Sequence, residues 1–242
     1  MNGPCSDTCI LIPTYNNAGT VGDVISRCRA SGLPIFVVDD GSDDATAGVL
    51  AAAGDIQVIR HPKNKGKGVA LKTGFIAARK AGFSYVITID ADGQHFPEDI
   101  PALMQRRARR TIVVGSRNIQ ADGMPSGSTF ANKFSNFWFT VQTARRLPDT
   151  QTGYRLYPLN DLPCLGLLTA RYEAELTLLE FSAWKGLKLV PVPVKVDYPE
   201  DRVSHFRPFR DFFRISLLNT ALCVLAIVYG YPRMLLQKIF GK

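Results

Sequence analysis

The chain has 242 residues, of which 46% are apolar and 21% are charged. It is long enough for one large domain or two small ones, and these proportions exclude wholesale disorder, a collagen-like chain and a polytopic membrane protein. Lysine and arginine number 29 against 21 acidic residues, and this net charge of +8 predicts an anionic partner: nucleic acid, a phosphorylated metabolite or a membrane surface. The alternative is a solvated basic face.

Short apolar runs alternate with segments of helical length through the first half of the sequence. The apolar runs are typical of buried strands, at 9–13, 34–39, 56–60, 85–90 and 111–115. Amphipathic helices are expected between them, at 20–31, 43–53, 68–82 and 97–109. This β-α-β-α order predicts an α/β fold with a Rossmann-like, mainly parallel sheet flanked by helices.

Polar clusters follow four of these strands, at the point where each strand ends: 14–17, 39–42, 90–94 and 116–117. The carboxyl ends of parallel strands share one edge of a sheet, and the helices that follow point their amino ends toward it. The four loops should therefore face a single crevice.

The second half of the sequence is less regular and carries more aromatic and basic residues. Residues 132–146 suit a helix lying against lipid or an apolar acceptor, and a core helix is the alternative. Residues 173–185 are predicted to be helical and residues 187–196 to be extended.

The uncharged run at 215–230 has 16 residues, fewer than the roughly 20 that span a bilayer. Basic residues flank it on both sides. We expect a domain at 1–205 followed by an amphipathic or hydrophobic, membrane-associated helical segment at 206–242, attached to the cytoplasmic face of a membrane peripherally or by a single anchor. A hairpin buried against the domain is the alternative. The amino terminus lacks a secretion signal, and the five cysteines form no CxxC pair, so we expect reduced thiols in a cytosolic domain.

Two carboxylates, those of Asp90 and Asp92, leave the fourth strand together beside the expected crevice. Mg²⁺ and Mn²⁺ prefer oxygen ligands and commonly take one or two carboxylates plus phosphate oxygens of a substrate. Gln94 adds a carbonyl oxygen. The pattern predicts a divalent metal site, with a solvated loop or a helix cap as the alternative.

Two further clusters suit a nucleotide. Asp39 and Asp40 can accept hydrogen bonds from a base or a ribose, and Tyr15 can stack on a base. The alternative is that this segment only caps the next helix, through Ser42 or Asp43. Residues 64–68 place two lysines among glycines before a helix. The P-loop pattern GxxxxGK[ST] is absent, which disfavours hydrolysis of that type.

Five ordered motifs resemble family 2 glycosyltransferases of the GT-A fold: IPTYN at 12–16, VVDDGSDDAT at 37–46, NKGKG at 64–68, DADGQH at 90–95 and GSR at 115–117. Within that family the chain is most similar to dolichyl- or polyprenyl-phosphate sugar synthases, through DTQTGYR at 149–155 and YEAE at 172–175. The resemblance covers about residues 8–205.

The resemblance implies a role for each matching residue. Those expected to bind the nucleotide sugar are Pro13, Tyr15, Asn17, Asp39, Asp40, Lys67, Asp90, Ala91, Asp92 and Arg117. Those expected to bind Mg²⁺ or Mn²⁺ are Asp90, Asp92 and Gln94. Those expected to bind the acceptor are Ser135, Arg155, Arg202, Ser204 and His205. Two positions depart from the family: Asn17 replaces a usual Glu, and the residues from Arg202 to His205 replace a usual Arg-x-x-Gly-x-Ser.

The resemblance also implies an inverting transfer in which charge builds on a departing diphosphate, stabilised by the metal at Asp90 and Asp92 and by Arg117. A polyprenyl phosphate acceptor is already ionised and needs no general base. A lipid or glycan hydroxyl needs one, for which Asp149 and Glu173 are candidates. The basic, aromatic second half favours the lipid phosphate.

Two other classes of function are alternatives. One is a membrane-docking scaffold without catalysis. The other is a nucleic-acid binder, which is disfavoured because no helix-turn-helix, RNA-recognition or zinc signature is present. The expected partners are a nucleotide sugar, the lipid acceptor and a membrane surface, with a membrane protein or a second copy of the chain left open.

Overall fold

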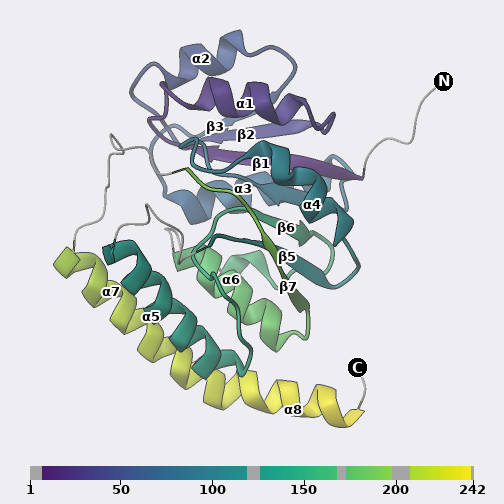
Figure 1. The fold of residues 1–242 in the computed structure, drawn as a ribbon, viewed down its shortest axis with the longest axis vertical. Helices are drawn as coiled ribbons and strands as arrows, with labels where there is room; N and C mark the ends of the chain where they lie inside the picture. The colour runs from purple at the N-terminus through teal and green to yellow at the C-terminus, as the bar shows by residue number, and fades with distance from the viewer. Residues whose placement is uncertain (1–6, 119–125, 168–172, 198–207, 241–242) are drawn as a thin grey trace.

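The structure is a computed structural model that describes residues 7–118, 126–167, 173–197 and 208–240. Within these residues seven strands form one sheet in the order β3-β2-β1-β4-β6-β5-β7 (Figure 1). The strands are β1 Thr8–Thr14, β2 Ile35–Asp39, β3 Gln57–Arg60, β4 Tyr85–Thr88, β5 Thr111–Ser116, β6 Arg155–Pro158 and β7 Lys188–Pro193. All pairings are parallel except those of β6, which is antiparallel to both β4 and β5. The predicted α/β fold is therefore confirmed, with β6 as a strand that the sequence pattern does not reveal.

Helices cover both faces of the sheet. They are α1 Val21–Arg29, α2 Thr46–Ala52, α3 Lys67–Lys80, α4 Ile100–Gln105, α5 Ser126–Thr143, α6 Glu173–Trp184, α7 Pro208–Leu225 and α8 Tyr231–Phe240. The helix expected at 97–109 shows the largest difference in the first half, because a 3₁₀ turn at Pro97–Asp99 precedes α4 and the helix ends at Gln105. The chain then turns back through Arg110, whose φ of 52° is left-handed, and β5 begins at the next residue.

The core consists of one apolar layer on each face of the sheet. Alternate residues of β1 divide between them: Leu11 belongs to the layer with Phe75 of α3, and Ile10 belongs to the layer with Val24 of α1. This division follows from the two-residue period of a strand. It explains why the strands of the first half are almost continuously apolar. Gly74 of α3 has no side chain, so this helix lies directly on the methyl groups of Leu11.

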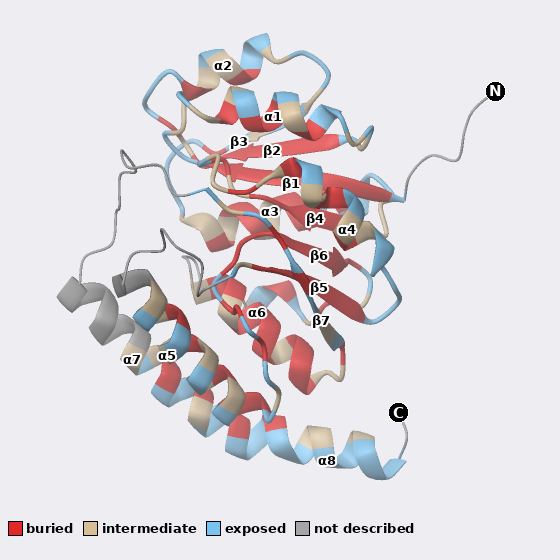
Figure 2. Ribbon diagram, in the orientation of Figure 1, coloured by how far each residue is buried: buried red, intermediate tan, exposed pale blue. Residues whose placement is uncertain are grey.

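The last helices form a rod across one end of the molecule (Figure 1). A π-helical turn at Ala226–Gly230 joins α7 to α8. The inner side of the rod packs on Trp184 of α6 through Leu222 and Ala226, and Gln142 of α5 donates to the carbonyl oxygen of Asn219 of α7 over 3.2 Å. Its outer side is largely exposed (Figure 2). The domain boundary expected after residue 205 lies outside the described residues and stays a prediction.

Candidate active site

The loops after β1, β2 and β4 meet at the carboxyl edge of the sheet. The backbone of Asn16 donates to Oγ of Ser42 over 3.0 Å, which joins the first loop to the second. The hydroxyl of Thr20 donates to the carbonyl oxygen of Ala91 over 2.6 Å, which joins the first loop to the third. These bonds hold the predicted nucleotide and metal motifs in one place, as the sequence pattern indicates.

The acidic pair after β2 holds the loops that surround it. Asp40 accepts hydrogen bonds from the backbone of Gly66 at 2.7 Å and from Nδ1 of His61 at 2.6 Å. Asp39 accepts one from the backbone of Ser42 at 2.9 Å and pairs with Arg60 at 3.2 Å. Both aspartates are almost fully buried. In the structure the two carboxylates hold the surrounding loops together. Binding of a nucleoside by either of them stays a prediction.

The remaining predicted nucleotide residues differ in exposure. Tyr15 is 37% exposed, which leaves its ring open to stacking, whereas Pro13 is buried in β1 beside Val38. The side-chain amide of Asn17 donates to Oγ1 of Thr14 over 3.2 Å and to the carbonyl oxygen of Tyr15 over 3.1 Å, so it closes its own loop.

A chain of alternating charges surrounds Asp90. Nζ of Lys67, in the first turn of α3, lies 2.7 Å from a carboxylate oxygen of Asp90 and 2.8 Å from one of Glu175 in α6. Burial opposes the charges of Lys67 and Asp90, yet the two carboxylates raise the pKa of Lys67, and Lys67 holds the pKa of Asp90 below its usual value. Lys67 is therefore charged at neutral pH and fixes Asp90 in position. Sequence reasoning missed this use of Glu175, because the pairing joins distant parts of the chain.

Asp92 lies on the solvent side of the same turn, and part of its side chain is exposed. Desolvation of the carboxylate and the charge of Asp90 raise the pKa of Asp92. A cation between the two carboxylates would relieve this repulsion. The backbone of Gln94 donates to Asp92 over 3.0 Å, and a metal contact from its side chain stays a prediction.

The donor set at this turn fits a hard divalent cation that shares its coordination with a substrate. In the part of the chain that the structure describes, no cluster of three or more His, Cys, Asp or Glu side chains could enclose a metal. Two carboxylates are enough for Mg²⁺ or Mn²⁺ when the phosphate oxygens of a nucleotide complete the shell. Asp90 and Asp92 would hold such an ion.

Asp90 also depends on the absence of a side chain at Gly153. A Cβ there would lie 2.5 Å from Oδ2 of Asp90. Gly153→Ala should displace this carboxylate and lower kcat by roughly a hundredfold, because misplacement of about 1 Å can have that effect. Steady-state kinetics measure kcat, and an unfolding experiment shows whether the variant is still folded.

Gly48→Ala is the matched control, because a Cβ at this exposed α2 position meets nothing within 4 Å. It should leave kcat unchanged and stabilise the helix by about 0.5–1 kcal/mol. Equal kcat in the two variants would show that the contact with Gly153 does not position Asp90.

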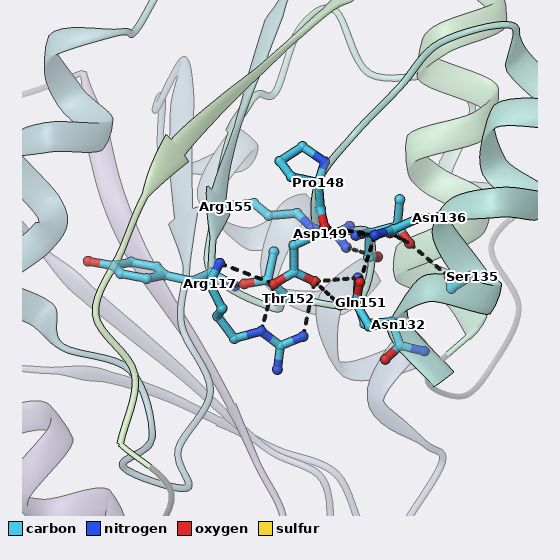
Figure 3. A network of polar contacts seen from close by, with 11 residues as sticks. Arg117, Asn132, Ser135, Asn136, Pro148, Asp149, Gln151, Thr152 and Arg155 are labelled. Carbon is cyan, nitrogen blue, oxygen red and sulfur yellow. Dashed lines mark hydrogen bonds and ion pairs between the residues drawn. The ribbon is translucent and has the colours of Figure 1, made fainter. Parts of the chain in front are cut away.

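Asp149 is the centre of a second polar network, at the end of β5 (Figure 3). Its carboxylate is fully buried and lies 2.6 Å from Nε and 3.0 Å from Nη2 of Arg117. It also accepts from Nδ2 of Asn132 at 2.6 Å and from the backbone of Gln151 at 3.1 Å. Burial opposes ionisation, but Arg117 and Asn132 hold the pKa of Asp149 below its usual value. A carboxylate stabilised in this way is a weak general base.

The same network ties α5 to the loop before β6. Oγ of Ser135 lies 2.8 Å from Oγ1 of Thr150, and the fully buried Arg155 donates to the carbonyl oxygens of Thr150 at 2.8 Å and Glu175 at 2.7 Å. Ser135 and Arg155 are thus used within the protein, and contact of either with an acceptor stays a prediction. Arg202, Ser204 and His205 lie outside the described residues.

Two further titratable side chains, those of Glu173 and His95, belong to segments that also supply residues to these networks. Glu173 is the first residue of α6, two positions before Glu175, and its role as a base stays a prediction. His95 is the last residue of the DADGQH motif and follows the acidic turn. Burial lowers the pKa of His95 to about 4, so its ring is neutral at pH 7 and adds no positive charge beside Asp90.

The chain is similar to known proteins over most of its length. The UDP-N-acetylglucosamine–dolichyl-phosphate N-acetylglucosaminyltransferase of Methanococcus voltae is 27% identical over 87% of this chain and 95% of its own length. The undecaprenyl-phosphate mannosyltransferase of Micrococcus luteus is 28% identical over 76% of this chain and 81% of its own.

Among solved structures, the glucosyl-3-phosphoglycerate synthase of Mycobacterium tuberculosis, in complex with Mn²⁺, UDP and glucosyl-3-phosphoglycerate, is similar with a TM-score of 0.66 at 19% identity. The similarity covers 90% of this chain and 79% of that one. This likeness shows that the fold is GT-A. The family model described as glycosyl transferase family 2 matches residues 9–157, which is more than half of the sequence. The chain therefore belongs to glycosyl transferase family 2.

Proposed function

We propose that the chain transfers a sugar, with inversion, from a UDP- or GDP-sugar to a polyprenyl phosphate. The observation that carries this proposal is the state of Asp149, whose carboxylate is buried and already occupied by Arg117 and Asn132. A phosphate acceptor is ionised at neutral pH and requires no base. Two relatives, a dolichyl-phosphate N-acetylglucosaminyltransferase and an undecaprenyl-phosphate mannosyltransferase, support the same acceptor class.

The residues of the two networks would act on the leaving group. Arg117, held by Asp149, presents a fixed guanidinium at the end of β5, where it can stabilise the charge that develops on a diphosphate. Asp90 and Asp92 would hold Mg²⁺ or Mn²⁺, which supplies charge neutralisation for the same diphosphate when bound. Lys67 keeps Asp90 in place by an ion pair at 2.7 Å.

The test is a panel of radiolabelled UDP- and GDP-sugars offered with polyprenyl phosphate, with the unphosphorylated polyprenol and with no acceptor. Label should enter the organic phase from at least one donor with polyprenyl phosphate, and a chelator should abolish its transfer. Equal transfer to polyprenol would favour a lipid hydroxyl as the acceptor and would make Glu173 the remaining candidate base. Failure with every donor would reject a catalytic role.

The outer face of the C-terminal rod supports attachment to a membrane, for which we propose the cytoplasmic face. Helical residues Ser216–Phe240 are long and apolar enough to cross a membrane by length and composition. Ile227 is 68% exposed and Val228 is 70% exposed, although both are large and apolar. Bilayer contact would bury this face while the inner face stays on Trp184. A donor site at the cytoplasmic face would also have access to nucleotide sugars.

Replacing Ile227 and Val228 together by glutamate should move the protein from the membrane to the soluble fraction. Each change removes on the order of 2 kcal/mol of apolar burial and adds a charge, so the partition coefficient should fall by well over tenfold. Flotation of vesicles with the full-length protein measures it. Ile76→Glu, at a 51% exposed position of α3, is the control and should float as the unmodified protein does. Unchanged flotation of the double variant would place the membrane contact elsewhere, for example on α5.

A further inference from the structure

A second polar site lies at the edge of the sheet opposite the candidate active site. Arg110 comes directly before β5 and Lys185 directly after α6, whereas the active-site groups follow β5 and begin α6. Helix α8 lies beside the end of α6 (Figure 1). Together with residues of α8, Arg110 and Lys185 border an open cavity of about 400 Å³. The lining residues are Arg110, Lys185, Arg233, Leu236, Gln237 and Phe240.

The three cations of this cavity have no carboxylate partner within 4.0 Å among the described residues. Nη2 of Arg110 donates to the carbonyl oxygen of Lys185 over 3.0 Å, and Nη1 of Arg233 donates to the hydroxyl of Tyr229 over 2.6 Å. Nζ of Lys185 donates to the carbonyl oxygen of Asp161 over 2.8 Å. These bonds orient the three cations, and none of them is made to a carboxylate.

Like charges that face one cavity repel each other, and this repulsion contributes to the pKa of Lys185. Burial lowers the pKa of Lys185, and Arg110 and Arg233 lower it further, while Asp161 acts in the opposite direction. The carboxylate of Asp161 accepts the backbone amide of Arg110 at 2.9 Å instead of pairing with any of the three side chains. An anion in the cavity would relieve the repulsion.

The other lining residues lie on α8, the helix that we propose to contact the membrane; Leu236 and Phe240 are apolar, and the side-chain amide of Gln237 donates to the carbonyl oxygen of Trp184 over 3.1 Å. Leu236 is 55% exposed and Phe240 is 68% exposed, and they follow Arg233 on α8 at helical spacings of three and seven residues. A small polar anion would make no favourable contact with Leu236 and Phe240. A lipid would, because its charged head group could lie at Arg233 while its hydrocarbon chains lie along these two apolar side chains. Arginine side chains also match phosphate oxygens with paired N–H groups.

We propose that this cavity binds the phosphate group of an anionic membrane lipid, with Arg110, Lys185 and Arg233 around the phosphate and the acyl chains along Leu236 and Phe240. The site would fix the rod in one orientation on the bilayer, because its α8 residues lie in the last part of the rod. It is separate from the sugar-transfer site, and its test requires no enzymatic activity.

The experiment measures binding of the full-length protein to vesicles of phosphatidylcholine alone and of phosphatidylcholine mixed with phosphatidylglycerol. Each basic residue near a lipid surface contributes about fivefold in affinity, so Arg110→Gln combined with Arg233→Gln should weaken binding to the anionic vesicles by about 25-fold. Binding to neutral vesicles should not change. Thermal unfolding of each variant verifies that it is folded.

The matched control combines Lys80→Gln with Lys238→Gln, which removes the same charge. Lys238 is on α8 but does not line the cavity, and Lys80 ends α3. The control should lose clearly less than the cavity variant. Equal losses would show diffuse attraction of a basic surface, and no loss in either would show that lipid charge is irrelevant. Both results would overturn the proposal.

A second variant and a second ligand complete the test. Gln237→Glu places a carboxylate inside the cavity without removing a cation, so it should abolish the preference for anionic vesicles even if the double variant fails to fold. Inorganic phosphate should not raise the Tm of the unmodified protein at millimolar concentration. Saturation by inorganic phosphate, with loss of vesicle selectivity, would identify a site for a soluble phosphate and reject the lipid.

Discussion

Asp92→Asn is expected to reduce sugar transfer by at least about a hundredfold, the effect commonly seen when one electrostatic contact to a developing charge is lost. Its fold should be intact, because the side chain is partly exposed and the asparagine oxygen can still accept the hydrogen bond from the backbone of Gln94. Asparagine also removes the repulsion from Asp90 that raises the pKa of Asp92, so stability at neutral pH should not fall.

The readouts for this variant are kcat, with saturating donor and acceptor, and the denaturant midpoint. Asp55→Asn, at an exposed turn, removes the same charge and should behave as the unmodified protein. Transfer that continues at near its full rate in Asp92→Asn, or in the unmodified protein after chelation, would refute a metal role for the acidic turn.

Asp149→Asn is expected to damage both activity and stability. The carboxylate is fully buried against Arg117, and removal of one partner from a buried ion pair commonly destabilises a protein by about 3–5 kcal/mol. Arg117 would also lose the bidentate contact that fixes its direction, so kcat should fall by roughly a hundredfold. Urea unfolding and steady-state kinetics measure the two losses.

The pH dependence distinguishes positioning from proton abstraction. The folded pKa of Asp149 is below its unfolded value of about 3.9, so the ion pair stabilises the protein above that pH. This stability is lost as the pH falls through the folded pKa. The difference in unfolding free energy between the unmodified protein and Asp149→Asn should therefore shrink in strong acid.

The pH profile of kcat/KM shows whether Asp149 also abstracts a proton. If Asp149 only orients Arg117, the pH profile of kcat/KM keeps its shape in Asp149→Asn and moves down as a whole. Its effect should also be strongly non-additive with Arg117→Gln, because the two residues act as a unit. Loss of an acidic limb from the profile would instead identify Asp149 as the base and favour a hydroxyl acceptor.

The sequence predicts the first half of the fold well because its signals there are local. Strands β1, β2, β4 and β5 are nearly continuous apolar runs that end in polar turns, as burial on both faces of the sheet requires, whereas β3 is an edge strand with mostly exposed residues. Strand β6 has four residues, Arg155–Pro158, and its place is decided by pairing with β4 and β5. Short apolar stretches of this kind become strands through tertiary contacts, which a local pattern does not encode.

The candidate site also combines residues that a local motif reveals with contacts that only the fold creates. The acidic turn at Asp90 and Asp92 is recognisable from its motif and its position after a strand. The pairing of Lys67 with Glu175 joins α3 to α6, and nothing in the spacing of these residues predicts it. Asp149 is identifiable as an important carboxylate, but only its burial and the five hydrogen bonds that it accepts indicate that it positions Arg117.

The affinity of UDP and GDP for the full-length protein, measured by calorimetry with and without Mn²⁺, tests the central claim most directly. One of the two nucleotides should bind at least about tenfold more tightly when Mn²⁺ is present, because the ion would link the acidic turn to the diphosphate. Asp92→Asn should remove this enhancement while metal-free binding persists. Binding of both nucleotides that is indifferent to Mn²⁺ and to Asp92 would contradict the account.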